Sequence, residues 1–309
     1  MTEPTIPSAG GFAVESRSGA VDWHLELDRR LLLPGRLVDG RLRLRARGDV
    51  RARGLVVALV GIEHWRHRVT RSDGQGHTHT EVVRSEGEPV REPVLVGQDV
   101  VLAAGEVLDR TFQLPVPSLG PATLEADDAG MDWTLEAKLD IEGGFDSHIE
   151  APVVIAQPTA LLRAGVVTLA ELALYDAADS AADGVTARIK LSPMPLVCGE
   201  AFDGELTLTL PRSLRVQEVR VELRVRIEAT VSQGEQEELT IWSGTVAGAG
   251  DLDGPQAFAL HGVLADTPLP SIELPHGRAS ATMHVILAKA WAVDTHLVRD
   301  VAIATTREL

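Results

Sequence analysis

The sequence contains a single cysteine, Cys198, among 309 residues, so no disulfide bond can form within the chain. A lone thiol fits a reducing compartment. No stretch approaches the roughly 20 consecutive apolar residues that a membrane-spanning helix needs. Residues 1–20 lack the basic start and apolar run of a secretion signal. These absences lead us to expect a cytoplasmic protein without a transmembrane segment.

Enzyme motifs are also missing. The sequence has no G-x-S-x-G elbow, no phosphate-binding loop, no dinucleotide fingerprint and no H-E-x-x-H zinc motif. The carboxylate pairs Asp127-Asp128 and Glu237-Glu238 fall in turn-like segments, which do not hold an acid and a base on opposite sides of a cleft. We therefore expect a protein that is not an enzyme and that needs no cofactor.

Positive charge is scarce overall but concentrated in one segment. The net charge of −16 disfavours nonspecific nucleic-acid binding. Between Arg29 and Arg53, however, nine arginines accompany only two acids, Asp39 and Asp49. Guanidinium groups suit bidentate contacts with carboxylates and phosphates. The expected partner is another protein with an acidic or phosphorylated segment. Peripheral membrane contact stays open, and the sequence does not indicate an oligomeric state.

The hydrophobic pattern has a period of two, which is typical of strands with one buried face. From Arg41 to Arg47, apolar residues alternate with arginines, and from Val219 to Glu228 they alternate with charged residues. Turn signals such as Pro34-Gly35 separate the runs. This pattern predicts an all-β fold of antiparallel sandwich sheets.

The first and second parts of the sequence carry the same pattern. The shared residues are Gly35, Asp39, Gly40, Leu42 and Leu44, which recur 164 positions later as Gly199, Asp203, Gly204, Leu206 and Leu208. The same offset carries Leu55, Val57 and Leu59 onto Val219, Val221 and Leu223. A constant offset across two separate strands indicates a duplicated domain.

These observations predict two tandem β-sandwich domains joined by a short segment with helical turns. We expect a disordered N-terminus at 1–18, a first sandwich at 19–157, a linker with short helical turns at 158–184, and a second sandwich at 185–305. The linker is expected because its leucines lose the period of two and an Asp/Ala-rich run follows them.

Three local patterns resemble the arrestin fold family. The first runs from Leu33 to Leu44 (Leu-Pro-Gly-Arg-Leu-Val-Asp-Gly-Arg-Leu-Arg-Leu) and continues from Arg53 to Glu63, an arginine-glycine-apolar run that ends in glycine-x-glutamate. The second is Leu102 to Pro115, with a glycine, an aromatic strand and a leucine-proline end.

The third pattern is Pro117-Ser-Leu-Gly before a strand at 131–137, where Trp133 stands in place of the tyrosine usual in the family. The later part of the chain echoes it as Leu269-Pro-Ser-Ile before Ala281 to Val285. The resemblance covers residues 21–302 and is nearest to the bacterial sporulation-control branch, which is short, cytoplasmic and two-domain.

The resemblance implies an adaptor or regulator that binds proteins without catalysis, in bacterial stress, cell-cycle or sporulation control. The chain departs from the eukaryotic branches because no proline-tyrosine motif precedes Leu309, and its only tyrosine is Tyr175. Arg29 and Arg30 lie on the same strand as the basic pair that senses phosphate in those branches. The gap between Arg30 and the following Asp-Gly is, however, shorter than in those branches. The two arginines are predicted to bind a partner, without an assigned role in phosphate sensing.

Four arginines form the main candidate site: Arg41, Arg43, Arg45 and Arg47. Like charges on one strand face repel one another unless acids or a ligand lie opposite. The stripe either binds an acidic partner or is a solvated face neutralised by acids on neighbouring strands, such as Glu136 or Glu150.

Four histidines form a second candidate, a metal site made of His64, His67, His77 and His79. On a hairpin, the first two could approach the last two, and imidazoles bind transition metals. An exposed histidine-rich loop is the alternative, because a closed zinc site needs four ligands in fixed geometry. This cluster supports an alternative function as a metal sensor or metal-dependent enzyme. A further alternative is a self-assembling structural β-protein.

Overall fold

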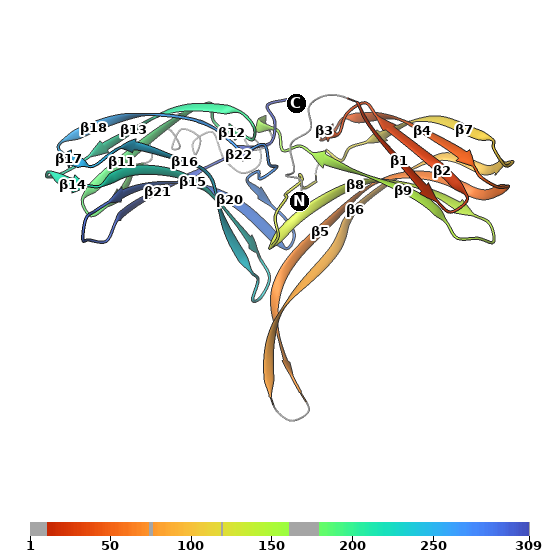
Figure 1. Ribbon diagram of the computed structural model, residues 1–309, viewed down its shortest axis with the longest axis horizontal. Coiled ribbons are helices and arrows are strands. Elements are labelled where there is room, and N and C mark those ends of the chain that lie inside the picture. The colour runs from red at the N-terminus through yellow and green to blue at the C-terminus, as the bar shows by residue number, and fades with distance from the viewer. Residues whose placement is uncertain (1–10, 74–76, 119, 161–178, 309) are drawn as a thin grey trace.

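The computed structural model describes residues 11–73, 77–118, 120–160 and 179–308 (Figure 1). Every named element in these residues is a β-strand, so the chain is all-β as the period of two predicted. Among the described residues, the model contains no helix long and apolar enough to cross a membrane.

Residues 12–155, called the first half here, form a sandwich of two sheets. Its strands are β1 (Phe12–Ser18), β2 (Val21–Leu27), β3 (Leu31–Leu32), β4 (Leu37–Ala46), β5 (Val50–Ser72), β6 (Thr78–Leu102), β7 (Val107–Pro115), β8 (Ala129–Ile141) and β9 (Ser147–Ile155). One sheet has the order β1-β2-β4-β7, and the other has the order β3-β9-β8-β5-β6.

Residues 179–304, called the second half, follow the same strand order. The strands are β10 (Asp179–Ala182), β11 (Val185–Ser192), β12 (Leu196–Val197), β13 (Ala201–Thr209), β14 (Leu214–Val216), β15 (Glu218–Ala229), β16 (Gln236–Ala247), β17 (Gly250–Leu252), β18 (Pro255–Val263), β19 (Ile272–Glu273), β20 (Gly277–Ala288), β21 (Thr295–Val301) and β22 (Ile303–Ala304). The sheet β10-β11-β13-β18 corresponds to β1-β2-β4-β7, and β16-β15-β20 with β21 corresponds to β6-β5-β8-β9. The pairs β14–β17 and β12–β22 complete this half.

The predicted turn glycines adopt the same backbone conformation in both halves. Gly35 has φ 75° and Gly199 has φ 74°, a left-handed conformation that costs glycine little. Gly40 and Gly204 lie in β4 and β13, where a Cβ would meet the Phe112 ring at 2.2 Å and the Lys190 carbonyl at 2.5 Å, respectively. Close packing therefore explains why the repeated pattern keeps glycine at these positions.

The N-terminal prediction was wrong for part of its range. Residues 12–18, expected to be disordered, form β1 and pair antiparallel with β2 from Phe12↔Leu27 to Ser18↔Val21. Phe12 and Val14 pack against the core, and this apolar contact holds the strand. Residues 1–10 and 161–178 lie outside the described residues. The linker predicted at 158–184 falls largely in the second of these ranges, but its end was wrongly predicted, because Asp179–Ala182 form strand β10 and pair with β11.

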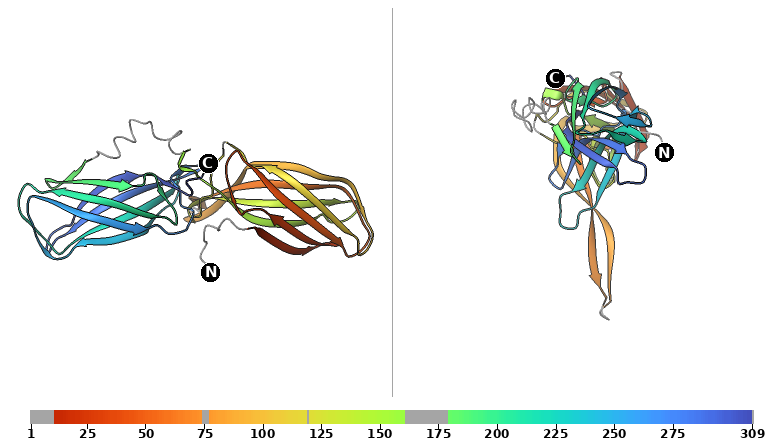
Figure 2. Two further views of the ribbon diagram at one scale, coloured as in Figure 1. Left: turned by 90° about the horizontal axis from the view of Figure 1, so that it is seen from above. Right: turned by 90° about the vertical axis from the view of Figure 1, so that its left-hand side faces the viewer.

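A long hairpin of β5 and β6 projects from the first half. β6 is continuous from Thr78 to Leu102, although it contains Pro89 and Pro93. Beyond Trp65, β5 no longer pairs with β8, so residues 66–72 and 78–84 form a two-stranded projecting ribbon (Figures 1 and 2). The turn between β15 and β16 adds backbone bonds at its base, where Arg68 N donates to Gln233 O at 2.9 Å.

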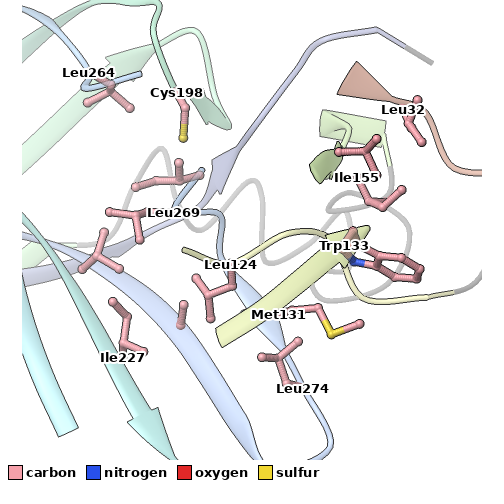
Figure 3. Packing of buried hydrophobic residues seen from close by; sticks show 14 of the residues in the cluster. Leu32, Leu124, Met131, Trp133, Ile155, Cys198, Ile227, Leu264, Leu269 and Leu274 are labelled. Atoms are coloured by element: carbon pink, nitrogen blue, oxygen red, sulfur yellow. The ribbon is translucent and has the colours of Figure 1, made fainter. Parts of the chain in front are cut away.

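The hydrophobic cores of the two halves join into one cluster. Leu124 and Met131 of the first half lie beside Leu269 and Leu274 of the second half, and all four are buried (Figure 3). At Gly277 the backbones approach so closely that a Cβ would lie 2.6 Å from the Cβ of Ala129. The interface between the halves is therefore a packed apolar contact.

Candidate functional site

The arginine stripe lies on the outer face of β4, in the middle of the β1-β2-β4-β7 sheet. Its acidic neighbours come from β2 and β7: Asp22 is the cross-strand partner of Arg45, Glu26 that of Arg41, and Asp109 that of Arg43. The expectation that Glu136 or Glu150 would neutralise the stripe was wrong. Those two residues lie on β8 and β9 of the other sheet, where Glu136 is paired with Arg91.

Two of the four arginines are paired with neighbouring acids. Arg41 makes a bidentate contact with Asp109, with Nε and Nη2 at 2.8 and 2.6 Å from the carboxylate oxygens. This contact lowers the pKa of Asp109 below its ordinary value. Arg47 lies 3.6 Å from Asp22 and donates to the carbonyl of Gly19. These two side chains are held within the sheet and are poorly placed to receive a ligand.

Arg43 and Arg45 are different, because no carboxylate of the described residues lies within ion-pair distance of either guanidinium. Both are exposed, and both line an open hollow of about 680 Å³ on the sheet surface. The other residues that line the hollow are Glu15, Ser16, Arg17, Asp22, Trp23, His24, Gly105 and Val107. The hollow therefore contains two guanidinium groups that form no ion pair with a described residue, although the carboxylates of Glu15 and Asp22 also line it.

His24 adds a titratable group directly beside this pair, because it is the cross-strand partner of Arg43. Its Nε2 lies 2.7 Å from Glu26 and its Nδ1 lies 3.0 Å from Glu15. The hydrogen bond with Glu26 is the main cause of a raised pKa of His24. In its protonated form, the imidazolium places a further positive charge in the hollow.

Arg29 and Arg30 lie outside the stripe, in the turn between β2 and β3. Arg29 pairs with its neighbour Asp28 at 3.4 Å. Arg30 donates to the carbonyl of Pro152 at 3.1 Å and lies 5.5 Å from the centre of the Phe12 ring. β2 lies between β1 and β4, so among the described strands the edges of this sheet are β1 and β7.

The structure does not bring the four histidines together. The cross-strand partner of His64 is Glu86 and that of His67 is Val83, whereas His79 faces Arg71. Four positions separate Val83 from residue 79, which is about 13 Å along a strand. The alternative of a shared metal site does not fit this register, because β5 and β6 continue far past His64 and His67 before they turn.

Each of these histidines has its own surroundings. His64 is buried, with Nε2 2.8 Å from the carbonyl of Ala126 and Nδ1 3.3 Å from Asp132. His77 is exposed and lies 3.1 Å from Asp73 at the ribbon tip. Among the residues the structure describes, no group of three or more His, Cys, Asp or Glu side chains could hold a metal ion.

A buried polar contact between the halves was not foreseen. Glu63 on β5 is only 2% exposed and accepts hydrogen bonds from His276 of the second half, from its backbone N at 2.6 Å and its Nδ1 at 2.9 Å. Trp65 stacks on the His276 ring at 4.0 Å. Glu63 lies on the buried face of β5 that includes Leu55. An acidic residue on an otherwise apolar strand face was the sequence feature that could have predicted this contact.

Cys198 is buried in the core, and burial raises the pKa of its thiol to about 11. Its place in the apolar cluster fits a packing role rather than a nucleophilic one.

No protein-family model matches the sequence. No curated protein matches it either.

Proposed function

We propose that the chain is a non-catalytic, arrestin-like adaptor that binds an acidic segment of a protein partner on the outer face of β1-β2-β4-β7. The observation that carries the proposal is the pair Arg43 and Arg45, two exposed guanidinium groups without a carboxylate partner among the described residues. The role in bacterial stress, cell-cycle or sporulation control rests on the resemblance alone. The matching strand order of the two halves supports the duplication.

The charges of the hollow favour an anionic ligand. Arg43 and Arg45 are alternate residues of β4, so their Cα atoms are about 7 Å apart and their like charges repel each other. A carboxylate or phosphate can relieve this repulsion, and the planar fork of each guanidinium accepts such a group in a bidentate contact. Acidic residues at alternate positions of an extended peptide have the same spacing as Arg43 and Arg45. The geometry therefore suits an extended segment with acids at i and i+2.

The proposal is tested by the affinity of a fluorescein-labelled peptide that carries glutamate at alternate positions, with a glutamine version as reference. The wild-type chain is expected to bind the glutamate peptide and not the glutamine peptide. The double variant R43E/R45E is expected to lose at least tenfold in affinity, because it reverses both free charges without breaking an ion pair.

The matched control is R212E/R215E, which makes the same charge change at two exposed arginines of the second half. It should bind the peptide with nearly the wild-type affinity. Thermal unfolding of R212E/R215E should stay close to wild type, because exposed substitutions outside ion pairs change stability little. R43E/R45E places glutamates opposite Asp109 and Asp22, so the neutral R43Q/R45Q is measured beside it and should lose affinity while it unfolds close to wild type. Equal losses in the two double variants, or no binding by wild type, would contradict the proposal.

Self-assembly remains an alternative, supported by the free edge of β1. Light scattering over a concentration series separates it from the adaptor. A mass that stays constant supports the adaptor, and a mass that rises with concentration and falls after a proline substitution in β1 supports self-assembly.

A further inference from the structure

The loop between β20 and β21 has an apolar tip that is fully open to solvent. Its four residues, Ala290 to Val293, are uncharged and exposed. The Trp291 side chain is fully exposed, and Val293 is 87% exposed. In Figure 1 the loop lies at the far end of the second half, at the lower left. Neither side chain contributes packing to the fold, and together they form a small apolar patch at the loop tip.

The backbone of this loop makes the choice of tryptophan more informative. The loop between β8 and β9 closes in the same way: Ile141 N donates to Asp146 Oδ1, and Lys289 N donates to Asp294 Oδ1. Each pair is 148 positions apart, and the same offset places Trp291 on a glycine, residue 143. That glycine has φ 65° and Trp291 has φ 62°.

A left-handed φ suits glycine and is unfavourable for a bulky side chain. The β8–β9 loop uses glycine there, so the loop conformation does not require an indole. Trp291 therefore opposes the local backbone preference and adds no packing. Strained residues of this kind persist where the side chain has a role at the surface.

The size of the tip favours a lipid surface over a protein partner. Tryptophan and valine together offer a few hundred Å² of apolar surface, well below the roughly 800 Å² that each partner buries in a stable protein complex. At the base of the tip lies the exposed carboxylate of Asp183, which pairs with Lys289 at 3.2 Å and accepts a hydrogen bond from the buried Thr295 at 2.8 Å. A small apolar tip without an apolar rim fits the headgroup region of a bilayer, where tryptophan is enriched and no preformed pocket is needed.

We propose that the Ala290–Val293 loop inserts Trp291 into the interfacial layer of a zwitterionic phospholipid bilayer. The net charge of −16 excludes attraction to anionic lipid as the driving force. Insertion is apolar, so it depends little on salt and weakens as anionic lipid is added. This contact is separate from the peptide site on β4.

Phe145 supplies the matched control. It is 96% exposed in the β8–β9 loop at the opposite end of the molecule, which Figure 1 shows at the lower right. Asp146 beside it has its counterpart in Asp294, but Glu142 stands where the other loop has Ala290, and no second large apolar side chain lies beside Phe145. The additional acid opposes insertion, so Phe145 tests whether any exposed aromatic ring is sufficient.

The experiment measures flotation of the full chain with phosphatidylcholine vesicles at low and high salt. We expect wild type to float with the vesicles equally at both salt concentrations, and less when phosphatidylserine is added. W291G should lose at least tenfold in partitioning, whereas F145G should behave like wild type. The melting temperature of W291G should equal or exceed that of wild type, because glycine relieves the left-handed φ.

Several results would overturn this inference. They are no flotation of the wild-type chain, equal losses in W291G and F145G, or flotation that falls steeply with salt. A change of molecular mass in solution caused by W291G would instead identify a second copy of the chain as the occupant. R43E/R45E should float like wild type, so failure of the peptide site leaves this test intact.

Discussion

Replacing Glu63 with alanine should lower the free energy of unfolding by about 3 kcal/mol. Glu63 is 2% exposed and accepts two hydrogen bonds from His276, at 2.6 and 2.9 Å. Hydrogen bonds to a charged group contribute about 1.5–3 kcal/mol each, and removing one partner of a buried ionic contact costs about 3–5 kcal/mol. The lower value applies because the His276 side chain is 43% exposed and regains contact with water.

Urea unfolding followed by circular dichroism measures this difference. Glu63→Gln keeps one acceptor oxygen and should cost about 1–2 kcal/mol, since one hydrogen bond survives. Glu92→Ala is the control, an exposed glutamate on β6 that should change stability by less than about 0.5 kcal/mol. A double-mutant cycle with His276→Ala should give a coupling energy of at least about 0.5 kcal/mol. If Glu63→Ala is as stable as the control, the contact between the halves contributes nothing and the reasoning is refuted.

Three further outcomes are expected. The Asp132 carboxylate is the main cause of the raised pKa of His64. The stability that this contact contributes is therefore fully present below pH 6.5 and is lost as the pH rises through the pKa of the folded state. Asp132→Asn should flatten that part of the curve of unfolding free energy against pH, measured by urea titration. Cys198, with a thiol pKa near 11, should react with Ellman's reagent at pH 8 only after unfolding, and fast reaction of the native chain would contradict its burial. Gly130→Ala should destabilise the chain by about 1–3 kcal/mol in urea, because the new Cβ would lie 2.4 Å from His64 and 2.9 Å from the Leu124 carbonyl; an unchanged midpoint would show that the backbone yields freely.

Local patterns were sufficient to predict most strands. β4 was expected at 37–47 and is observed at Leu37–Ala46, with Leu42 and Leu44 buried and the arginines outside. Alternation of apolar and polar residues indicates directly which face of a strand is buried, so this prediction needs no knowledge of contacts distant in sequence. The continuity of β6 was missed because Pro89 and Pro93 resemble breaks. Both are tolerated because β6 is an edge strand, where a missing backbone donor costs little.

The surroundings of the candidate site depend on the register in which β4 pairs with β2 and β7, and the sequence alone does not show this register. Arg43 and Arg45 were identified from their alternation, but the acids around them come from β2 and β7, and pairing with β7 joins residues more than 60 positions apart. Whether the four histidines lie close together also depends on register, because the length of the β5–β6 hairpin decides which side chains face each other. The prediction of disorder for residues 12–18 was wrong because most of these residues are polar, and only Phe12 and Val14 supply the alternating apolar contacts with the core.

The shared apolar cluster has a consequence for how the chain can be divided. Leu124 and Met131 are covered by Leu269 and Leu274 across the interface, so either half expressed alone would expose an apolar surface to water. Truncated fragments should aggregate or recruit a detergent rather than remain monodisperse. The two lobes thus depend on each other for solubility, and a change in their relative orientation requires repacking of side chains instead of rotation about a loose tether.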